Sequence, residues 1–148
     1  VFVNLSVQEN LEMGAWTRSE GINERLEEMF TLFPDLREKR RQAAGSLSGG
    51  QRQMVAMAKA LMVDAKVLLL DEPTAGLSPK YRGEIFSTIK EINSTGVPIL
   101  IVEQNAKQAL GCANRGYVLV DGTNRFQGTG TDLLEDRDVA RMFLGGGE

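Results

Sequence analysis

Apolar and polar positions in the first part of the chain follow the period of amphipathic helices. Over residues 22–33, apolar side chains recur every three or four positions, and Pro34 marks the end of this predicted helix. An earlier helix is expected over residues 7–16, because Ser6 and Glu9 have the spacing of a capping box. The chain therefore begins with a helical region.

The middle of the chain alternates strand with helix. Residues 67–70 form a continuous apolar run, which predicts a strand covered on both faces. Residues 99–102 predict the next strand. Between them a helix is expected to start with Ser78 as cap and Pro79 at its first position, and to stop at Gly96. This order predicts an α/β fold.

Local signals complete the list of expected elements. A helix with a buried stripe should begin at Ser48, and Asn105 should cap a short helix that reaches about residue 113. Asp121 and Gly122 lie between two short strands and predict a hairpin. Residues 131–144 are expected to form short helices.

Composition narrows the possible chemistry. The chain has 148 residues, 42% hydrophobic and 25% charged, which is ordinary for one modest globular domain. A net charge of −3 gives no basic field, so we expect no nucleic-acid partner, and the basic run at residues 37–41 is interpreted as a solvated helix face. Histidine is absent, which excludes Ser–His and Cys–His catalysis. Cys112 is the only cysteine, which excludes an internal disulfide and suits a reducing cytosol.

Two adjacent carboxylates, Asp71 and Glu72, end the apolar run at residues 67–70. In parallel α/β sheets, ligands bind at this edge. Neighbouring side chains on an extended chain point to opposite sides, so one acid can hold Mg²⁺ through water while the other orients or deprotonates a water. Taken alone, the pair fits equally well a strand that ends in acidic turn residues.

A second motif favours the interpretation of the two acids as a functional site. This motif is the segment Ser48, Gly49, Gly50 and Gln51. Glycines at a helix start allow another molecule to approach the backbone, and the free N–H groups with the positive end of the helix dipole suit a phosphate. A Ser-Gly-Gly turn alone is usually only a turn. Here it precedes the acid-tipped strand by one helix length, and the loop of residues 73–78 follows.

These two motifs resemble those of a known family. The run LSGGQ at residues 47–51, followed by LLLDEP at residues 68–73, is similar to the signature and Walker B motifs of ATP-binding-cassette (ABC) ATPases, and the resemblance covers essentially the whole chain. The runs at residues 7–11, 102–106 and 115–119 look like those of the smaller ATP-binding subunit of bacterial branched-chain amino-acid importers. ATPases of urea, amide and other solute importers share much of this pattern.

The resemblance implies a role for each site residue. Asp71 would support Mg²⁺, and Glu72 would be the catalytic base. Gln104 would stand at the switch position, where the family usually has histidine. The signature would clamp the γ-phosphate of ATP held by a second ATP-binding subunit, which is homologous or identical; it consists of Ser48, Gly49, Gly50 and Gln51. A loop would pass between the two nucleotide sites; it consists of Ala75, Gly76, Leu77 and Ser78. The family usually has aspartate at the last position of this loop.

The resemblance also implies an architecture and partners. The chain would be part of an ABC-type P-loop NTPase domain, with a helical subdomain over about residues 1–47 and the signature helix, Walker B strand, switch strand, hairpin and final helices over about residues 48–148. Residues 2–11 would lie beside the surface that receives transmembrane permease subunits. The protein would then be cytoplasmic, peripheral on the inner face of the cell membrane.

A phosphate-binding loop is not found in this sequence. Such a loop needs glycines followed by lysine and a hydroxyl residue, and no Gly-Lys pair occurs. Members of the family carry the loop upstream of the segment that this chain matches, so we expect an ATPase that lacks its N-terminal part. Alone, it would bind ATP and Mg²⁺ weakly, hydrolyse nothing and self-associate through exposed apolar surface. The alternative is a truncated, non-enzymatic interaction module.

Overall fold

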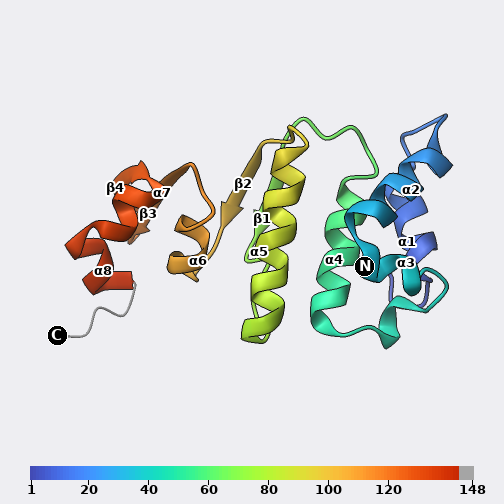
Figure 1. Ribbon diagram of the computed structural model, residues 1–148, viewed down its shortest axis with the longest axis horizontal. Coiled ribbons are helices and arrows are strands. Elements are labelled where there is room, and N and C mark those ends of the chain that lie inside the picture. The colour runs from blue at the N-terminus through green and yellow to red at the C-terminus, as the bar shows by residue number, and fades with distance from the viewer. Residues whose placement is uncertain (144–148) are drawn as a thin grey trace. The chain divides into compact units, whose positions relative to one another are not determined.

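The computed structural model describes residues 1–143 and shows a mixed α/β chain (Figure 1). It divides into two compact units, Val1–Leu100 and Ile101–Glu148, each of which is described by itself. The predicted boundary near residue 47, between a helical subdomain and the rest of the domain, stays a prediction. The fold class predicted from the sequence is confirmed.

The first unit begins with a set of helices: α1 (Val7–Gly14), α2 (Ile22–Leu32), α3 (Pro34–Glu38), the 3₁₀ helix η1 (Ala44–Ser46) and α4 (Gly49–Ala60). The capping box at the start of α1 is confirmed, since the Ser6 hydroxyl accepts a hydrogen bond from the Glu9 N–H at 3.2 Å and the Glu9 carboxylate accepts one from the Ser6 N–H at 2.7 Å. Pro34 follows the end of α2, as predicted, and is the first residue of α3.

Strand β1 (Leu68–Asp71), helix α5 (Pro79–Ser94) and strand β2 (Ile99–Val102) follow, and β1 pairs with β2. The strand–helix–strand order is the one predicted. Ser78 occupies the N-cap position of α5 and Pro79 the first helical position, but the Ser78 side chain makes no capping hydrogen bond.

The prediction that both faces of β1 are covered is wrong for the part of the chain that the structure describes. Leu68 and Leu70 are buried, whereas the side chain of Leu69 between them is 66% exposed. Successive side chains of a strand point to opposite faces, so one face of β1 is packed and the other is open. Val67 and Leu100 are also more than half exposed, which confirms the expected exposed apolar surface.

The core of the first unit lies between its helices. Helix α1 packs against α4, α2 against α3, and α4 against α5. The largest fully buried side chains come from all of these helices and the segments that join them: Phe30, Leu11, Leu36, Met57, Leu61, Met62, Ile85, Ile92, Val7 and Val55. This core holds the start of α4 and the start of α5 in one body.

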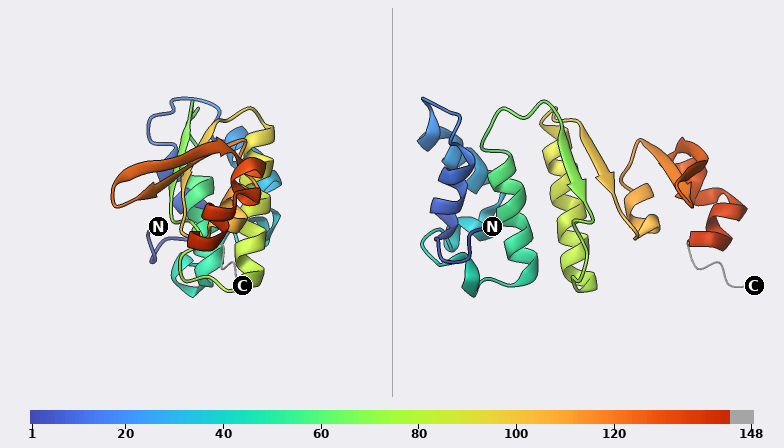
Figure 2. Two further views of the ribbon diagram at one scale, coloured as in Figure 1. Left: turned by 90° about the vertical axis from the view of Figure 1, so that its left-hand side faces the viewer. Right: turned by 180° about the vertical axis from the view of Figure 1, so that it is seen from behind.

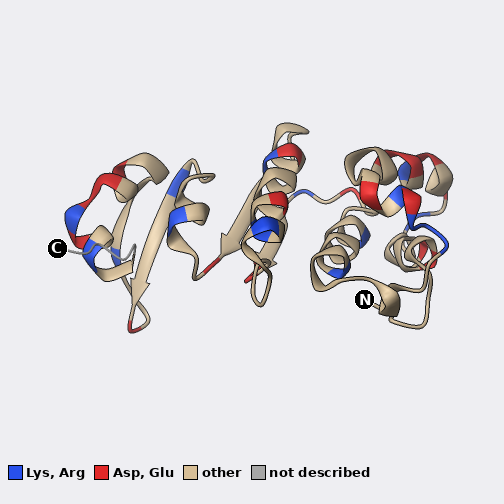
Figure 3. Ribbon diagram, turned by 60° about the horizontal axis from the view of Figure 1, so that its bottom comes forward, with Lys and Arg blue, Asp and Glu red and all other residues tan. Residues whose placement is uncertain are grey.

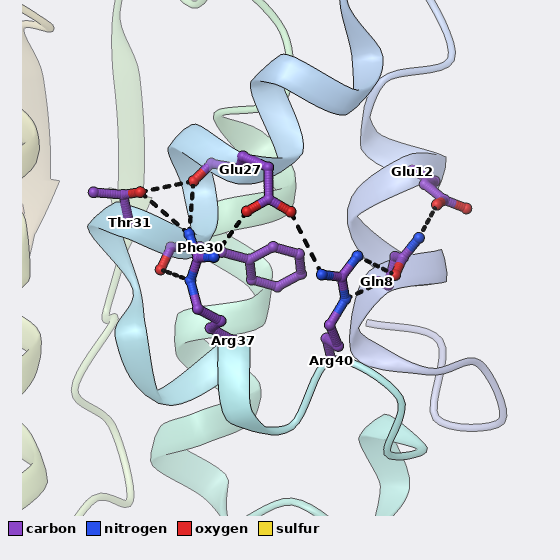
Figure 4. Close-up of polar contacts among 7 residues, drawn as sticks. All are labelled: Gln8, Glu12, Glu27, Phe30, Thr31, Arg37 and Arg40. Atoms are coloured by element: carbon purple, nitrogen blue, oxygen red, sulfur yellow. Dashed lines mark hydrogen bonds and ion pairs between the residues drawn. The ribbon is translucent and has the colours of Figure 1, made fainter.

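Two arginines of the basic run are tied into this unit, so the run is more than a solvated helix face. Arg37 and Arg40 both pair with the Glu27 carboxylate, at 2.8 and 3.4 Å, and both guanidinium groups lie over the Phe30 ring (Figure 4). Arg40 also donates two hydrogen bonds to the Gln8 side-chain oxygen, at 2.9 and 3.1 Å. The cluster therefore links the segment after α3 to α1 and α2.

The second unit is built on a two-stranded ribbon (Figure 2). Its elements are α6 (Ala106–Leu110), β3 (Arg115–Val120), β4 (Thr123–Thr129), α7 (Gly130–Glu135) and α8 (Arg137–Phe143). A small core of Leu110, Leu133 and Val139 packs against Val118 and Phe126 of the ribbon. Asn105 occupies the N-cap position of helix α6, as predicted, but its side chain makes no capping hydrogen bond, and the helix ends at Leu110, earlier than expected.

The turn between β3 and β4 confirms the hairpin signal. Asp121 and Gly122 have φ angles of 49° and 74°, so both adopt the left-handed conformation that a two-residue hairpin turn requires. Val120 pairs with Thr123 across the turn, and the register shifts between Val118 and Leu119. Short helices follow, as predicted; residue 144, the expected end of the last one, lies outside the described residues.

Candidate functional site

The start of α4 is fixed by reciprocal hydrogen bonds between Ser48 and Gln51. The Ser48 N–H donates to the Gln51 side-chain oxygen at 3.1 Å, and the Gln51 N–H donates to the Ser48 hydroxyl at 3.2 Å. This is the capping box that the sequence predicts. The first N–H groups of a helix have no acceptor within the helix, so Gly49 and Gly50 place backbone donors at this end of α4.

Arg52, for which the sequence predicts no structural role, stabilises the segment that precedes α4. The Arg52 guanidinium donates a hydrogen bond to the Leu47 carbonyl, and Leu47 itself is buried. The segment before the helix is therefore held by the burial of the Leu47 side chain and by a hydrogen bond from a residue of the first helical turn.

The two acids lie where the sequence places them, at the end of β1. Asp71 is the last residue of the strand and is exposed, and Glu72 follows it and is half-buried. Glu72 has φ 44°, a left-handed conformation that is uncommon for a residue other than glycine. Strained backbone of this kind is concentrated at functional sites. The chain leaves the strand through a sharp turn, in which the Glu72 carbonyl accepts a hydrogen bond from the Ala75 N–H at 3.0 Å.

The segment from residue 73 to residue 78 is a braced loop. Thr74 is buried, and its carbonyl accepts a hydrogen bond from the Leu77 N–H at 3.2 Å. The Leu77 carbonyl accepts a further bond from Nε of Arg82 in α5 at 2.9 Å. The loop is thus tied at both of its ends.

The structure brings this loop against the start of α4. A Cβ atom added to Gly49 would lie 3.5 Å from Cδ2 of Leu77, and one added to Gly50 would lie 2.7 Å from Cδ1 of Tyr81. Two motifs that are separate in the sequence are therefore neighbours within the first unit. Tyr81 was not predicted from the sequence, because nothing in its local pattern indicates which helix it faces.

Gln104 belongs to the second unit and is exposed. Its carbonyl accepts a hydrogen bond from the Ala106 N–H at 2.8 Å, next to a bond of 3.1 Å from the Asn105 N–H to the Glu103 carboxylate. Its grouping with Glu72 stays a prediction, because the two residues lie in different units.

The acidic chemistry at the end of β1 suits a hard cation. Among residues 1–143 no group of three or more histidine, cysteine or acidic side chains could hold a metal ion alone. Mg²⁺, however, is commonly held by one or two carboxylates together with water and substrate phosphates. The exposed carboxylate of Asp71 fits such a role.

A groove lies at another place on the first unit, between the N-terminal segment, α1 and α4. Its lining includes Phe2, Met13, Trp16, Lys59 and Val63. Trp16 is 82% exposed, and the Lys59 ammonium lies 4.0 Å from the centre of the Phe2 ring. An exposed apolar groove with one cation at its wall is a candidate surface for a protein partner.

Charge is distributed unevenly over the elements (Figure 3). Helix α2 carries Glu24, Glu27 and Glu28 against a single arginine, Arg25. Among residues 1–143, no helix combines the length and the hydrophobicity that a membrane span needs.

Comparison with known proteins gives consistent similarities. The profile of the ABC transporter family matches residues 1–75. The chain is 44% identical over 147 residues to the probable branched-chain amino acid transport ATP-binding protein LivF of Archaeoglobus fulgidus, covering 98% of this chain and 62% of that protein. It is also 44% identical to the high-affinity branched-chain amino acid transport ATP-binding protein BraG of Pseudomonas aeruginosa, covering 99% of this chain and 63% of that protein.

A more distant relative and a solved structure agree. The lipopolysaccharide export system ATP-binding protein LptB of Escherichia coli K12 is 35% identical over 98% of this chain and 61% of its own length. The crystal structure of the ADP conformation of MJ1267, an ATP-binding cassette of an ABC transporter, superposes with a TM-score of 0.79 at 27% identity, covering 98% of this chain and 65% of that one. The chain thus spans about 62% of the length of the curated relatives it matches.

Proposed function

The chain belongs to the ABC transporter family, and from this membership we propose that it is part of an ATP-binding subunit that drives uptake of branched-chain amino acids. The observation that carries the proposal is the 44% identity, over 98% of the chain, to a protein named for branched-chain amino acid transport. The identity to the lipopolysaccharide export protein is lower, 35%. The difference favours amino-acid import over lipopolysaccharide export.

In the proposed reaction, Glu72 acts on the attacking water. The water oxygen bonds to the γ-phosphorus of ATP, the bond from that phosphorus to the oxygen of ADP breaks, and Glu72 orients the water and accepts its proton. The position of Glu72 in a tight turn directly after β1 supports this role, because such a turn fixes the carboxylate at the sheet edge where ligands bind. Asp71 would hold Mg²⁺, which supplies positive charge to the phosphate oxygens.

The start of α4 has a different task in this proposal. Ser48, Gly49, Gly50 and Gln51 would face the γ-phosphate of ATP bound to a second ATP-binding subunit, so that two subunits enclose the nucleotides between them. The helix N-terminus with its free N–H groups supports this, since it favours an anionic group. The loop of Ala75, Gly76, Leu77 and Ser78 would pass between the two sites, and Gln104 would donate a neutral hydrogen bond to the γ-phosphate.

The groove lined by Phe2, Met13 and Trp16 is the proposed binding surface for a transmembrane permease subunit. Its exposed apolar side chains would be covered by an apolar segment of that partner. This contact would place the protein on the inner face of the cell membrane.

The experiment that tests the proposal uses the full-length protein that contains this chain, expressed with its permease subunits in cells that lack their own leucine, isoleucine and valine uptake. We expect uptake of these amino acids to be restored by the parent protein and abolished by Glu72→Gln. Restored uptake of urea or an amide in their place would overturn the assignment of the solute.

The proposed binding surface for the permease is tested separately. Trp16→Glu should abolish co-purification with the permease subunits, because it places a charge in an apolar contact. The ATPase rate of the isolated subunit should stay at the parent level. Glu20→Gln, at an exposed position outside the groove, serves as the matched surface control. Unchanged co-purification of the Trp16→Glu protein would exclude this groove as the binding surface for the permease.

A further inference from the structure

Gly50 stands at a position where local helix formation does not favour glycine. It is the second residue of α4 and is buried. Glycine is among the poorest helix formers, so a residue with a side chain would stabilise the helix better. Some other contact must account for the absence of a side chain at this position.

That contact is Tyr81, in the first turn of α5. A Cβ atom added to Gly50 would lie 2.7 Å from Cδ1, 2.9 Å from Cγ and 3.2 Å from Cβ of Tyr81. The last two of these atoms are close to the backbone of α5, so rotation of the ring cannot remove the overlap. The backbone of α4 therefore approaches α5 as closely as it does because Gly50 has no side chain.

Leu77 extends the same contact by one residue. Its Cδ2 would lie 3.5 Å from a Cβ added to Gly49, an ordinary van der Waals distance. The main chain at Leu77 is itself held by Arg82, whose Nε donates to the Leu77 carbonyl and whose N–H donates to the Ser78 carbonyl at 3.0 Å. Tyr81 and Leu77 thus form a fixed support beneath the two glycines.

We propose that Tyr81 is a positioning residue for the start of α4. Its ring sets the distance between α4 and α5, and so it sets where the Gly49 and Gly50 N–H groups stand relative to the loop of residues 75–78. The proposal rests on the proposed function in one respect, namely that these N–H groups face a phosphate of nucleotide held by the partner subunit. The contact uses the Cβ and ring carbons of Tyr81, so phenylalanine should serve equally well.

A double-mutant cycle on the 148-residue chain tests the contact without any nucleotide. Urea unfolding is measured for Gly50→Ala, Tyr81→Ala and the double variant. We expect Gly50→Ala to lower the folding equilibrium constant about tenfold or more in the parent, as overpacking does, and by at most about threefold in the Tyr81→Ala background, where only the Cβ contact of 3.2 Å remains. Gly49→Ala is the matched control and should have a small effect in both backgrounds. An equal loss for Gly50→Ala in both backgrounds overturns the proposal.

The functional consequence is tested in the full-length protein that contains this chain. ATP-dependent dimerisation is followed by light scattering in a Glu72→Gln background, which prevents turnover. We expect Tyr81→Ala to raise the protein concentration of half-dimerisation about tenfold, because small displacements of aligned groups weaken their joint contacts strongly. Tyr81→Phe should behave as the parent, and so should Ser87→Ala on the exposed side of α5.

The ATP affinity of the monomer distinguishes a positioning role of Tyr81 from general damage to the fold, because such damage would lower this affinity. It should be unchanged by Tyr81→Ala, since the nucleotide that the start of α4 would face belongs to the partner. A fall in this affinity by the same factor, or dimerisation of Tyr81→Ala at the parent concentration, overturns the positioning role. If the parent itself forms no ATP-dependent dimer, the proposed function fails, whereas the unfolding cycle still decides whether Tyr81 supports Gly50.

Discussion

At the scale of single residues, Glu72 combines a proposed chemical role with an unusual backbone conformation. Its φ of 44° lies in a region where a Cβ atom makes unfavourable contacts, at a cost of about 1–3 kcal/mol. Asp121, the other described residue of this kind apart from glycine, lies in a hairpin turn where the conformation is expected. Glu72 instead lies in the turn that follows β1, in which its carbonyl accepts a hydrogen bond from the Ala75 N–H.

We predict that Glu72→Gly makes the chain more stable than Glu72→Ala. Both substitutions remove the carboxylate and its contacts, but only glycine adopts the left-handed conformation without strain. Relief of about 1–3 kcal/mol, less the extra unfolded-state entropy of glycine of about 0.5–1 kcal/mol, leaves a gain of about 1 kcal/mol in the free energy of unfolding. Urea unfolding of the two variants measures the difference. Equal stabilities would show that the turn is not strained.

Gln104 is proposed to donate a neutral hydrogen bond to the γ-phosphate, since a glutamine amide does not titrate near neutrality. In the full-length protein, Gln104→Ala should lower ATP turnover by about 10²-fold, the typical effect of losing one oriented hydrogen bond to developing charge. Nucleotide affinity should change little. Gln104→His should retain activity and add a pH dependence between about pH 5 and 8, where histidine changes its charge. Parent-rate turnover by Gln104→Ala would make the residue structural only.

At the scale of elements, the start of α1 couples helix formation to pH. The hydrogen bonds from the Ser6 hydroxyl and the Ser6 N–H lower the pKa of Glu9 below its usual value. A carboxylate whose pKa is lower in the folded state adds stability above its unfolded pKa of about 4.3, and this contribution is lost as the pH falls through the folded value.

We therefore predict that the parent chain loses stability relative to Glu9→Gln as the pH falls below about 4.3. Glutamine at this position keeps the capping geometry and does not titrate. The free energy of unfolding is measured for both proteins between pH 7 and pH 3. Ser6→Ala removes the hydroxyl that contributes most to the lowered pKa, so it should reduce the pH dependence. Parallel pH profiles of the parent and Glu9→Gln would refute the coupling.

The elements also show how far the sequence alone reaches. The starts of α1 and α4 were predictable because a capping box is local, with both partners three residues apart. The open face of β1 was not, since an apolar run reports how hydrophobic a strand is and not which neighbours cover it. The contact between Gly50 and Tyr81 was missed for the same reason: it joins residues about thirty positions apart, and only the packing of α4 on α5 brings them together.

At the scale of the whole molecule, the 148-residue chain holds the acids and the signature but no Gly-Lys phosphate loop. The lysine and the glycine cradle normally supply most contacts to the β- and γ-phosphates. We predict that the purified chain shows no Mg²⁺-dependent ATP hydrolysis above a Glu72→Gln control and binds ATP weakly at best. Phosphate release and calorimetric titration measure the two properties. Turnover above the control would contradict this expectation.

The open strand faces of the first unit lead to the last prediction, self-association of the purified chain. Val67, Leu69 and Leu100 are exposed by 51%, 66% and 59%, and all three lie on or beside paired strands. Exposed apolar side chains on a strand favour association, and a charge placed among them opposes it. Light scattering should therefore give a mass that rises with concentration for the parent. Leu69→Lys should lower that mass, while Ser87→Lys, which adds the same charge to the exposed side of α5, should not. A parent chain that stays monomeric at high concentration would mean that these exposed apolar faces do not drive association. An equal effect of both lysines would instead attribute the association to net charge rather than to the strands.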